Sequence, residues 1–96
     1  MRLPVLRSEK PETTVVTLAD ACLGYLAEHP DELMAFMQYA GLDPAALRKA
    51  VGTDGLQHGL LDYFASNEPI LLALCANMGS TPEQFMRVWH RLNPNG

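Results

Sequence analysis

Three groups of residues have the types and spacing that metal binding or catalysis would need. Residues 28–32 contain two glutamates, a histidine and an aspartate, a density of oxygen and nitrogen donors that a divalent cation could use. His58 lies four residues from both Asp54 and Asp62, the spacing at which a carboxylate on the same helix face can pair with an imidazolium. Cys75 could act as a nucleophile if the fold placed a histidine beside it.

The sequence context favours structural roles for all three groups. Pro30 interrupts the acidic cluster and suits the start of a helix, where acids in the first turn are stabilised by the helix dipole. Cys22 and Cys75 lie in apolar surroundings with neither a Cys-x-x-Cys pair nor a histidine at ligand spacing, which is typical of core cysteines. We therefore expect no metal and no cofactor, and no catalytic residue. An enzyme using Cys75 or a His-Asp pair stays open as an alternative.

The elements that must position these residues are helices. Apolar residues recur three and four positions apart, and proline or glycine interrupts the pattern at each expected boundary. Thr81 and Gln84 have the spacing of a capping box. No stretch alternates with period two, so we expect no sheet. The fold class predicted is all-α, a compact bundle of six short helices over about 14–29, 30–40, 44–51, 56–66, 68–78 and 82–92.

Length and charge limit the function classes. With 96 residues, 48% of them hydrophobic, the chain has room for one domain with a real core, expected over residues 14–94 after a flexible tail at 1–13. The net charge of −4 argues against nucleic acid as a partner. The basic start is not followed by the apolar segment of a signal peptide, and no apolar run approaches the length of a membrane span. We expect a cytoplasmic protein that is not bound to a membrane.

The two halves of the chain resemble each other. Residues 21–51 align without a gap on residues 59–89, with seven identities in 31 pairs. The identities include Tyr25 with Tyr63 and Ala35 with Ala73, positions that turn chemistry does not dictate. An interpretation without duplication is that any two units of helix, Gly-x-x-Pro and helix look alike. The alignment predicts two tandem three-helix repeats, packed with pseudo-twofold symmetry.

Basic residues are confined to two of the predicted helices. From Pro11 to Met86 the only Lys or Arg residues are Arg48 and Lys49, and Arg87 and Arg91 follow in the last helix. These cations can balance helix dipoles and pair with acids on neighbouring helices. They can also offer a surface to a partner, with the nearby tryptophan as an anchor. The interaction surface predicted on this second interpretation comprises Arg48, Lys49, Met86, Arg87, Trp89 and Arg91.

These observations favour a protein-protein interaction or regulatory module whose partner is an unidentified protein, with a homodimer as a further form of association. Met34 and Met86 lie off the main apolar helix faces, which makes them candidates for an exposed apolar patch or a dimer seam. A carrier of apolar small molecules is the alternative, with a cavity between the two units near Tyr25 and Tyr63.

Several segments carry a resemblance to a known family: Tyr-Leu-Ala-Glu-His-Pro at 25–30, Gly-Leu-Asp-Pro at 41–44, Leu-Asp-Tyr-Phe at 61–64 and Glu-Pro-Ile-Leu-Leu-Ala-Leu-Cys at 68–75, together with Phe36. Over about residues 15–94 the chain resembles domain-of-unknown-function family 3572, which comprises small bacterial proteins common among alphaproteobacteria. The resemblance implies a short, all-helical cytoplasmic protein. It carries over no catalytic residue.

Overall fold

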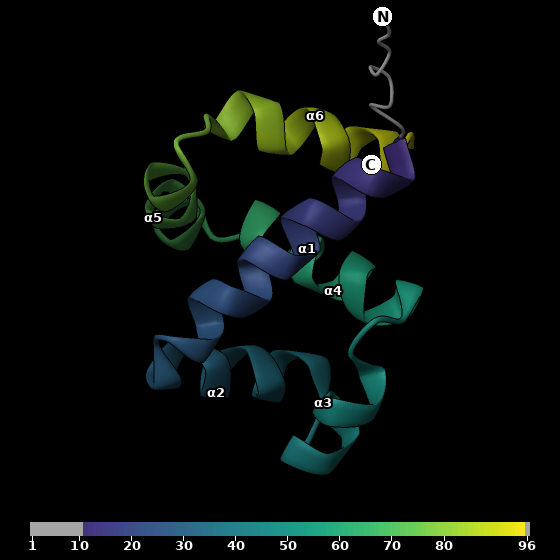
Figure 1. The fold of residues 1–96 in the computed structure, drawn as a ribbon, viewed down its shortest axis with the longest axis vertical. Helices are drawn as coiled ribbons and strands as arrows, with labels where there is room; N and C mark the ends of the chain where they lie inside the picture. The colour runs from purple at the N-terminus through teal and green to yellow at the C-terminus, as the bar shows by residue number, and fades with distance from the viewer. Residues whose placement is uncertain (1–10, 96) are drawn as a thin grey trace, which may run out of the picture.

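The computed structural model describes residues 11–95, and six α-helices with short connections make up this part of the chain (Figure 1). No strand occurs within it, so the predicted all-α class is confirmed. The helices are α1 (Pro11–Ala27), α2 (Pro30–Ala40), α3 (Pro44–Ala50), α4 (Asp54–Ala65), α5 (Glu68–Met78) and α6 (Pro82–Leu92).

Local sequence signals explain where the helices begin. The carboxylate of Asp43 accepts a hydrogen bond from the Ala46 amide at 2.7 Å and caps α3. Thr53 caps α4 by accepting from the Leu56 amide at 3.2 Å. The predicted capping box of α6 is present, since the Thr81 hydroxyl and the Gln84 side chain each accept from the other's backbone amide.

Two helix starts differ from the predicted ones. Helix α1 begins at Pro11, three residues before the start we expected at Thr14. Proline suits a first helical position because an amide hydrogen there would have no acceptor within the helix, so its absence in proline loses no hydrogen bond. The rest of the predicted tail, residues 1–10, lies outside the described residues. Helix α4 begins at Asp54, before the predicted position 56, because Thr53 is its N-cap.

The core forms around α1 and α4, which pack directly against each other. In Figure 1, α1 crosses the middle of the molecule, α6 lies at one end, and α2 and α3 lie at the other. The largest fully buried side chains are apolar, and no polar or charged side chain is buried among the described residues. The largest fully buried side chains are Phe36, Phe64, Phe85, Leu26, Leu60, Leu61, Leu74 and Cys22.

The turns of the two halves have closely matched backbone conformations. Gly41 ends α2 at φ 72°, ψ 34°, and Gly79 ends α5 at φ 67°, ψ 32°, both in the left-handed region that favours glycine. His29 and Asn67, which precede α2 and α5, have φ, ψ of −132°, 83° and −128°, 87°. Side-chain bonding is matched as well. His29 Nδ1 lies 2.7 Å from the carbonyl oxygen of Tyr25, and Asn67 Nδ2 donates to that of Tyr63 at 2.6 Å.

These matches fall at positions that the alignment of residues 21–51 with 59–89 makes equivalent. They describe the turns and the helix ends. The duplication itself and the pseudo-twofold axis stay predictions.

None of the helices within residues 11–95 combines the length and the apolar character that crossing a membrane requires.

Candidate functional site

The residues predicted to form one interaction surface are divided between two ends of the molecule. Figure 1 shows α3, which carries Arg48 and Lys49, at the end opposite to α6, with α1 and α4 between them. The predicted residues therefore lie in two separate regions, and their role in binding a partner stays a prediction. Sequence equivalence does not imply proximity, because related positions in two units packed against each other can face opposite directions.

On α6 the predicted residues differ in exposure. Met86 is half-buried against the core, so it is not the exposed methionine that we expected, whereas Met34 on α2 is 57% exposed. Trp89 is half-buried, and its indole N–H donates to Asp62 Oδ1 at 2.6 Å. Arg87 and Arg91 are exposed, as are Arg48 and Lys49 on α3.

None of these four cations forms an ion pair with any described residue. The interpretation in which they pair with acids on neighbouring helices therefore finds no support in residues 11–95. Their charges are available to groups outside the chain.

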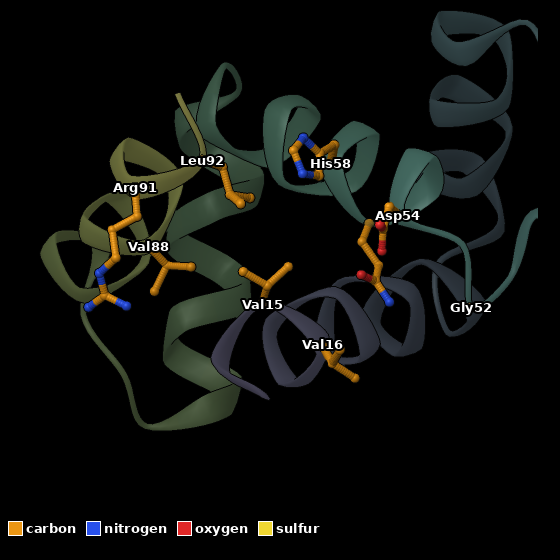
Figure 2. A pocket seen from close by; sticks show the side chains of 9 residues that line it. Val15, Val16, Gly52, Asp54, His58, Val88, Arg91 and Leu92 are labelled. Atoms are coloured by element: carbon orange, nitrogen blue, oxygen red, sulfur yellow. The ribbon is translucent and has the colours of Figure 1, made fainter. Parts of the chain in front are cut away.

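A groove lies between the N-terminal part of α1, the first turns of α4 and the C-terminal part of α6 (Figure 2). Its volume is about 450 Å³. We call it the α1–α4–α6 groove. Its lining residues are Val15, Val16, Gly52, Asp54, Gln57, His58, Val88, Arg91 and Leu92.

Helical spacing explains which side chains line this groove. On α6, Arg91 and Leu92 lie three and four residues after Val88, so both share a face with it. On α4, Asp54 and His58 are four residues apart and share a face in the same way.

The groove is apolar in the middle and oppositely charged at its ends. Figure 2 shows the side chains of Val88, Val15 and Leu92 between the arginine on one side and the aspartate on the other. Val16, at 40% exposure, extends the apolar surface toward Asp54. Such a groove suits an apolar segment that carries unlike charges at its two ends.

His58 takes a different role from the predicted surface pairing. The structure places it on the wall of the α1–α4–α6 groove with Asp54, and it forms no ion pair or hydrogen bond with any described residue. Asp62, the other expected partner, accepts the hydrogen bond of Trp89 instead. The imidazole is exposed and can contribute a polar contact to whatever fills the groove.

Neither cysteine is placed for nucleophilic chemistry. Cys22 is 0% exposed and Cys75 is 3% exposed. Burial raises the pKa of both thiols, with a further contribution from Cys75 at Cys22 and from Glu83 at Cys75. Protonated, inaccessible thiols are typical of structural cysteines and are poor nucleophiles. The geometry therefore gives no support to the enzyme alternative that uses Cys75.

Aromatic rings occupy the region where the carrier alternative requires a cavity. The centroid of the Tyr63 ring lies 5.3 Å from that of the Phe36 ring and 6.0 Å from that of the Phe64 ring, in edge-to-face geometry. Tyr25 meets Phe64 at 6.0 Å in the same geometry. Burial, followed by the charge of Glu32, raises the pKa of the Tyr63 phenol. Neither tyrosine lines the α1–α4–α6 groove.

The acidic cluster at residues 28–32 is not arranged as a set of metal ligands. Within the described part of the chain, no group of three or more His, Cys, Asp and Glu side chains is arranged to hold a metal ion. Asp31 and Glu32 lie in the first turn of α2, as expected for acids that stabilise a helix N-terminus.

A family model described as "Protein of unknown function (DUF3572)" matches residues 12–95. The chain belongs to this family. The match confirms the resemblance found in the sequence and covers all six helices except the first residue of α1. No curated protein and no solved structure matches the chain.

Membership of DUF3572 supplies no residue roles, because the description of the family assigns none. The α1–α4–α6 groove lies within the matched residues. Any function given to it rests on its own shape, charge and exposure.

Sequence reasoning identified part of this groove. Arg91 was predicted as a binding residue, and the spacing of Asp54 and His58 was noted. Val16 was missed. The available signal was the pair Val15-Val16, since neighbouring residues on a helix point about 100° apart and both cannot face the same core.

Proposed function

We propose that this member of DUF3572 is a protein-binding module of the bacterial cytoplasm without catalytic activity, and that it docks a segment of a partner protein in the α1–α4–α6 groove. The observation that carries the proposal is an apolar groove with an unpaired arginine at one end and an aspartate at the other. Val16 and Leu92 remain accessible for contact with a partner.

The arrangement suggests the chemistry of the segment. Apolar side chains would lie over Val15, Val88 and Leu92, where removal from water favours binding by about 25 cal/mol per Å². An acidic side chain would meet Arg91, since arginine forms strong, directional bonds with carboxylates. A basic or amide group would meet Asp54. These opposite charges fix the direction in which the segment lies.

Charge-matched variants test this function. The tagged protein is used to recover binding proteins from extract of the native organism, with Arg91→Glu as the test and Arg87→Glu as the control. Both arginines are exposed on α6, but only Arg91 lines the groove. We expect the amount of each protein recovered with wild type and with Arg87→Glu to fall about tenfold or more with Arg91→Glu.

A second matched pair tests the apolar part of the groove. Val16→Glu places a charge in it, whereas Leu72→Glu places one at an exposed leucine of α5 that does not line it. Circular dichroism and thermal unfolding check that all variants fold. If Val16→Glu and Arg91→Glu recover the same proteins as their controls, the groove is not the binding site.

A small-molecule carrier is the second candidate, and one observation favours it. The groove volume of about 450 Å³ falls within the range of ligand pockets, roughly 300–1,000 Å³. The carrier hypothesis therefore places the small molecule in the α1–α4–α6 groove and not near Tyr25 and Tyr63. Native mass spectrometry of the same preparations separates the two candidates. A bound small molecule lost in Val16→Glu, with no protein recovered by wild type, would favour the carrier.

A further inference from the structure

The α1–α4–α6 groove has two unlike halves. Val88 and Arg91 of α6 lie in one half and share a helix face. Val16 of α1 lies in the other half, toward Asp54 of α4 (Figure 2). Val15 lies between the two. Each half therefore combines an apolar residue with a charged one, and the two charges are opposite. We call them the arginine half and the aspartate half.

The two halves also differ in how far their apolar side chains stand out from the surface. Val16, in the aspartate half, is 40% exposed, whereas Val88, in the arginine half, is 5% exposed. A projecting apolar side chain fits over a recessed apolar surface, because their contact removes water from both. The aspartate half is therefore complementary to the arginine half in shape as well as in charge.

Both charges are available to a group outside the chain. Arg91 and Asp54 are exposed, and neither side chain forms an ion pair or a hydrogen bond with any described residue. The N-cap of α4 is Thr53, whose hydroxyl accepts from the Leu56 amide, so the Asp54 carboxylate is not used as a cap. An exposed arginine and an exposed aspartate at opposite ends of one groove can each take a partner of the other kind.

A surface with two mutually complementary halves is complementary to a second copy of itself. In a twofold dimer, if residue i of one copy contacts residue j of the other, then j contacts i as well. A twofold axis that crosses the groove near Val15 brings the arginine half of each copy against the aspartate half of the other. Arg91 then faces Asp54 twice, and Val16 lies over Val88 twice.

We propose that the α1–α4–α6 groove is the interface of a homodimer, with a second copy of this chain as its occupant. Exposed ion pairs contribute little energy each and small interfaces are weak, so the dimer dissociates on dilution. The dimer covers the surface that a partner segment needs. Self-association therefore controls access to the groove, and this regulatory role rests on the proposed function, whereas the dimer itself does not.

Sedimentation of the full chain tests the dimer. We expect wild type to pass from monomer to dimer as its concentration rises from about 1 to roughly 500 µM. Arg91→Glu and Asp54→Arg each place like charges opposite one another at both ends of the interface, so each should weaken association about tenfold or more. Arg87→Glu changes an exposed arginine of α6 outside the groove and should associate as wild type does.

Mixing the two weakened variants gives the sharpest test. In a dimer of one Arg91→Glu chain and one Asp54→Arg chain, the native aspartate of the first faces the native arginine of the second. The two introduced side chains face each other and are also opposite in charge. We expect the equimolar mixture to recover association within about threefold of wild type, although neither variant associates alone. Variants that had failed to fold could not do so, and circular dichroism checks each one.

A chain with both substitutions separates the dimer from the proposed function. Both charges of the groove are then exchanged together, so two such chains remain complementary to each other and should associate as wild type does. A partner segment that lies in a fixed direction meets like charges at both ends. We expect the double variant to recover about tenfold less of the proteins that wild type recovers from extract.

Three results would overturn the dimer. They are a wild type that stays monomeric up to roughly 500 µM, an Arg91→Glu variant that associates as tightly as wild type, and a mixture that stays monomeric. If proteins are still recovered by wild type and lost with Arg91→Glu, the dimer alone has failed. If the dimer responds as expected but no protein is recovered in an Arg91-dependent way, the proposed function and the regulatory role have failed.

Discussion

The unit formed by α2 and α3 and the unit formed by α5 and α6 have the same turn and different packing. The glycine caps, proline starts and aligned spacing are shared. Yet α3 buries only Leu47, whereas α6 buries Phe85 and Val88 and its tryptophan donates to α4. Turn chemistry thus sets the path of the chain, and the size of the side chains that follow decides how much of the helix is buried in the core.

The largest expected effect comes from the aligned core positions of α3 and α6. Phe85 is 1% exposed and Leu47 is 9% exposed. We expect Phe85→Ala to lower the free energy of unfolding by about 3–5 kcal/mol, because it leaves a large cavity in a packed region. Leu47→Ala should cost about 2 kcal/mol, since the short helix can relax around it.

Urea unfolding followed by circular dichroism measures both losses, with the slope of each transition checked against wild type. Equal losses would mean that α3 is as firmly packed as α6 and would remove the contrast between the two units.

The next largest effect concerns the glycine caps that the two units share, at the ends of α2 and α5. Gly41→Val and Gly79→Val should each lower the free energy of unfolding by about 1 kcal/mol or more, since a β-branched residue is poorly tolerated at φ of 72° or 67°. Neither site is crowded, so the cost reflects the backbone alone. Thermal or urea unfolding measures it. A large loss at one glycine with none at the other would show that the turns are energetically different despite their matched dihedrals.

The smallest effect tests a contact that only the second unit has. Trp89→Phe removes the indole donor to Asp62 and should cost about 1 kcal/mol. Val51, the aligned residue after α3, is 52% exposed, and Val51→Ala should change stability by less than about 0.5 kcal/mol. Asp62→Asn, whose amide oxygen still accepts, is the control and should cost less than Trp89→Phe. A loss in Val51→Ala as large as that in Trp89→Phe would contradict this comparison.

Much of the fold was predictable because its signals are local. The capping box at Thr81 and the glycine caps depend on residues a few positions apart, and the structure confirms them. The start of α1 was misplaced because Pro11 fits both a loop and a first helical turn.

The α1–α4–α6 groove and the position of α3 were less accessible to sequence reasoning. Trp89 and Asp62 are 27 residues apart, and no periodicity connects a donor on one helix with an acceptor on another. Arg91 was identified by its charge, whereas Val16 matters through which helices lie opposite it. The division of the predicted interaction surface has the same cause. A list of exposed cations contains no information about the distance between α3 and α6.

The all-apolar interior of the described residues has a consequence for how members of this family can diverge. Buried polar networks tie residues to fixed partners, whereas an interior of interchangeable aliphatic and aromatic groups tolerates substitution as long as volume is kept. The information that selects this arrangement of helices then lies outside the interior, in the prolines, glycines and capping hydroxyls of the connections. Exchanges that keep the volume of the interior should therefore leave the architecture intact, while these few residues at the surface specify it.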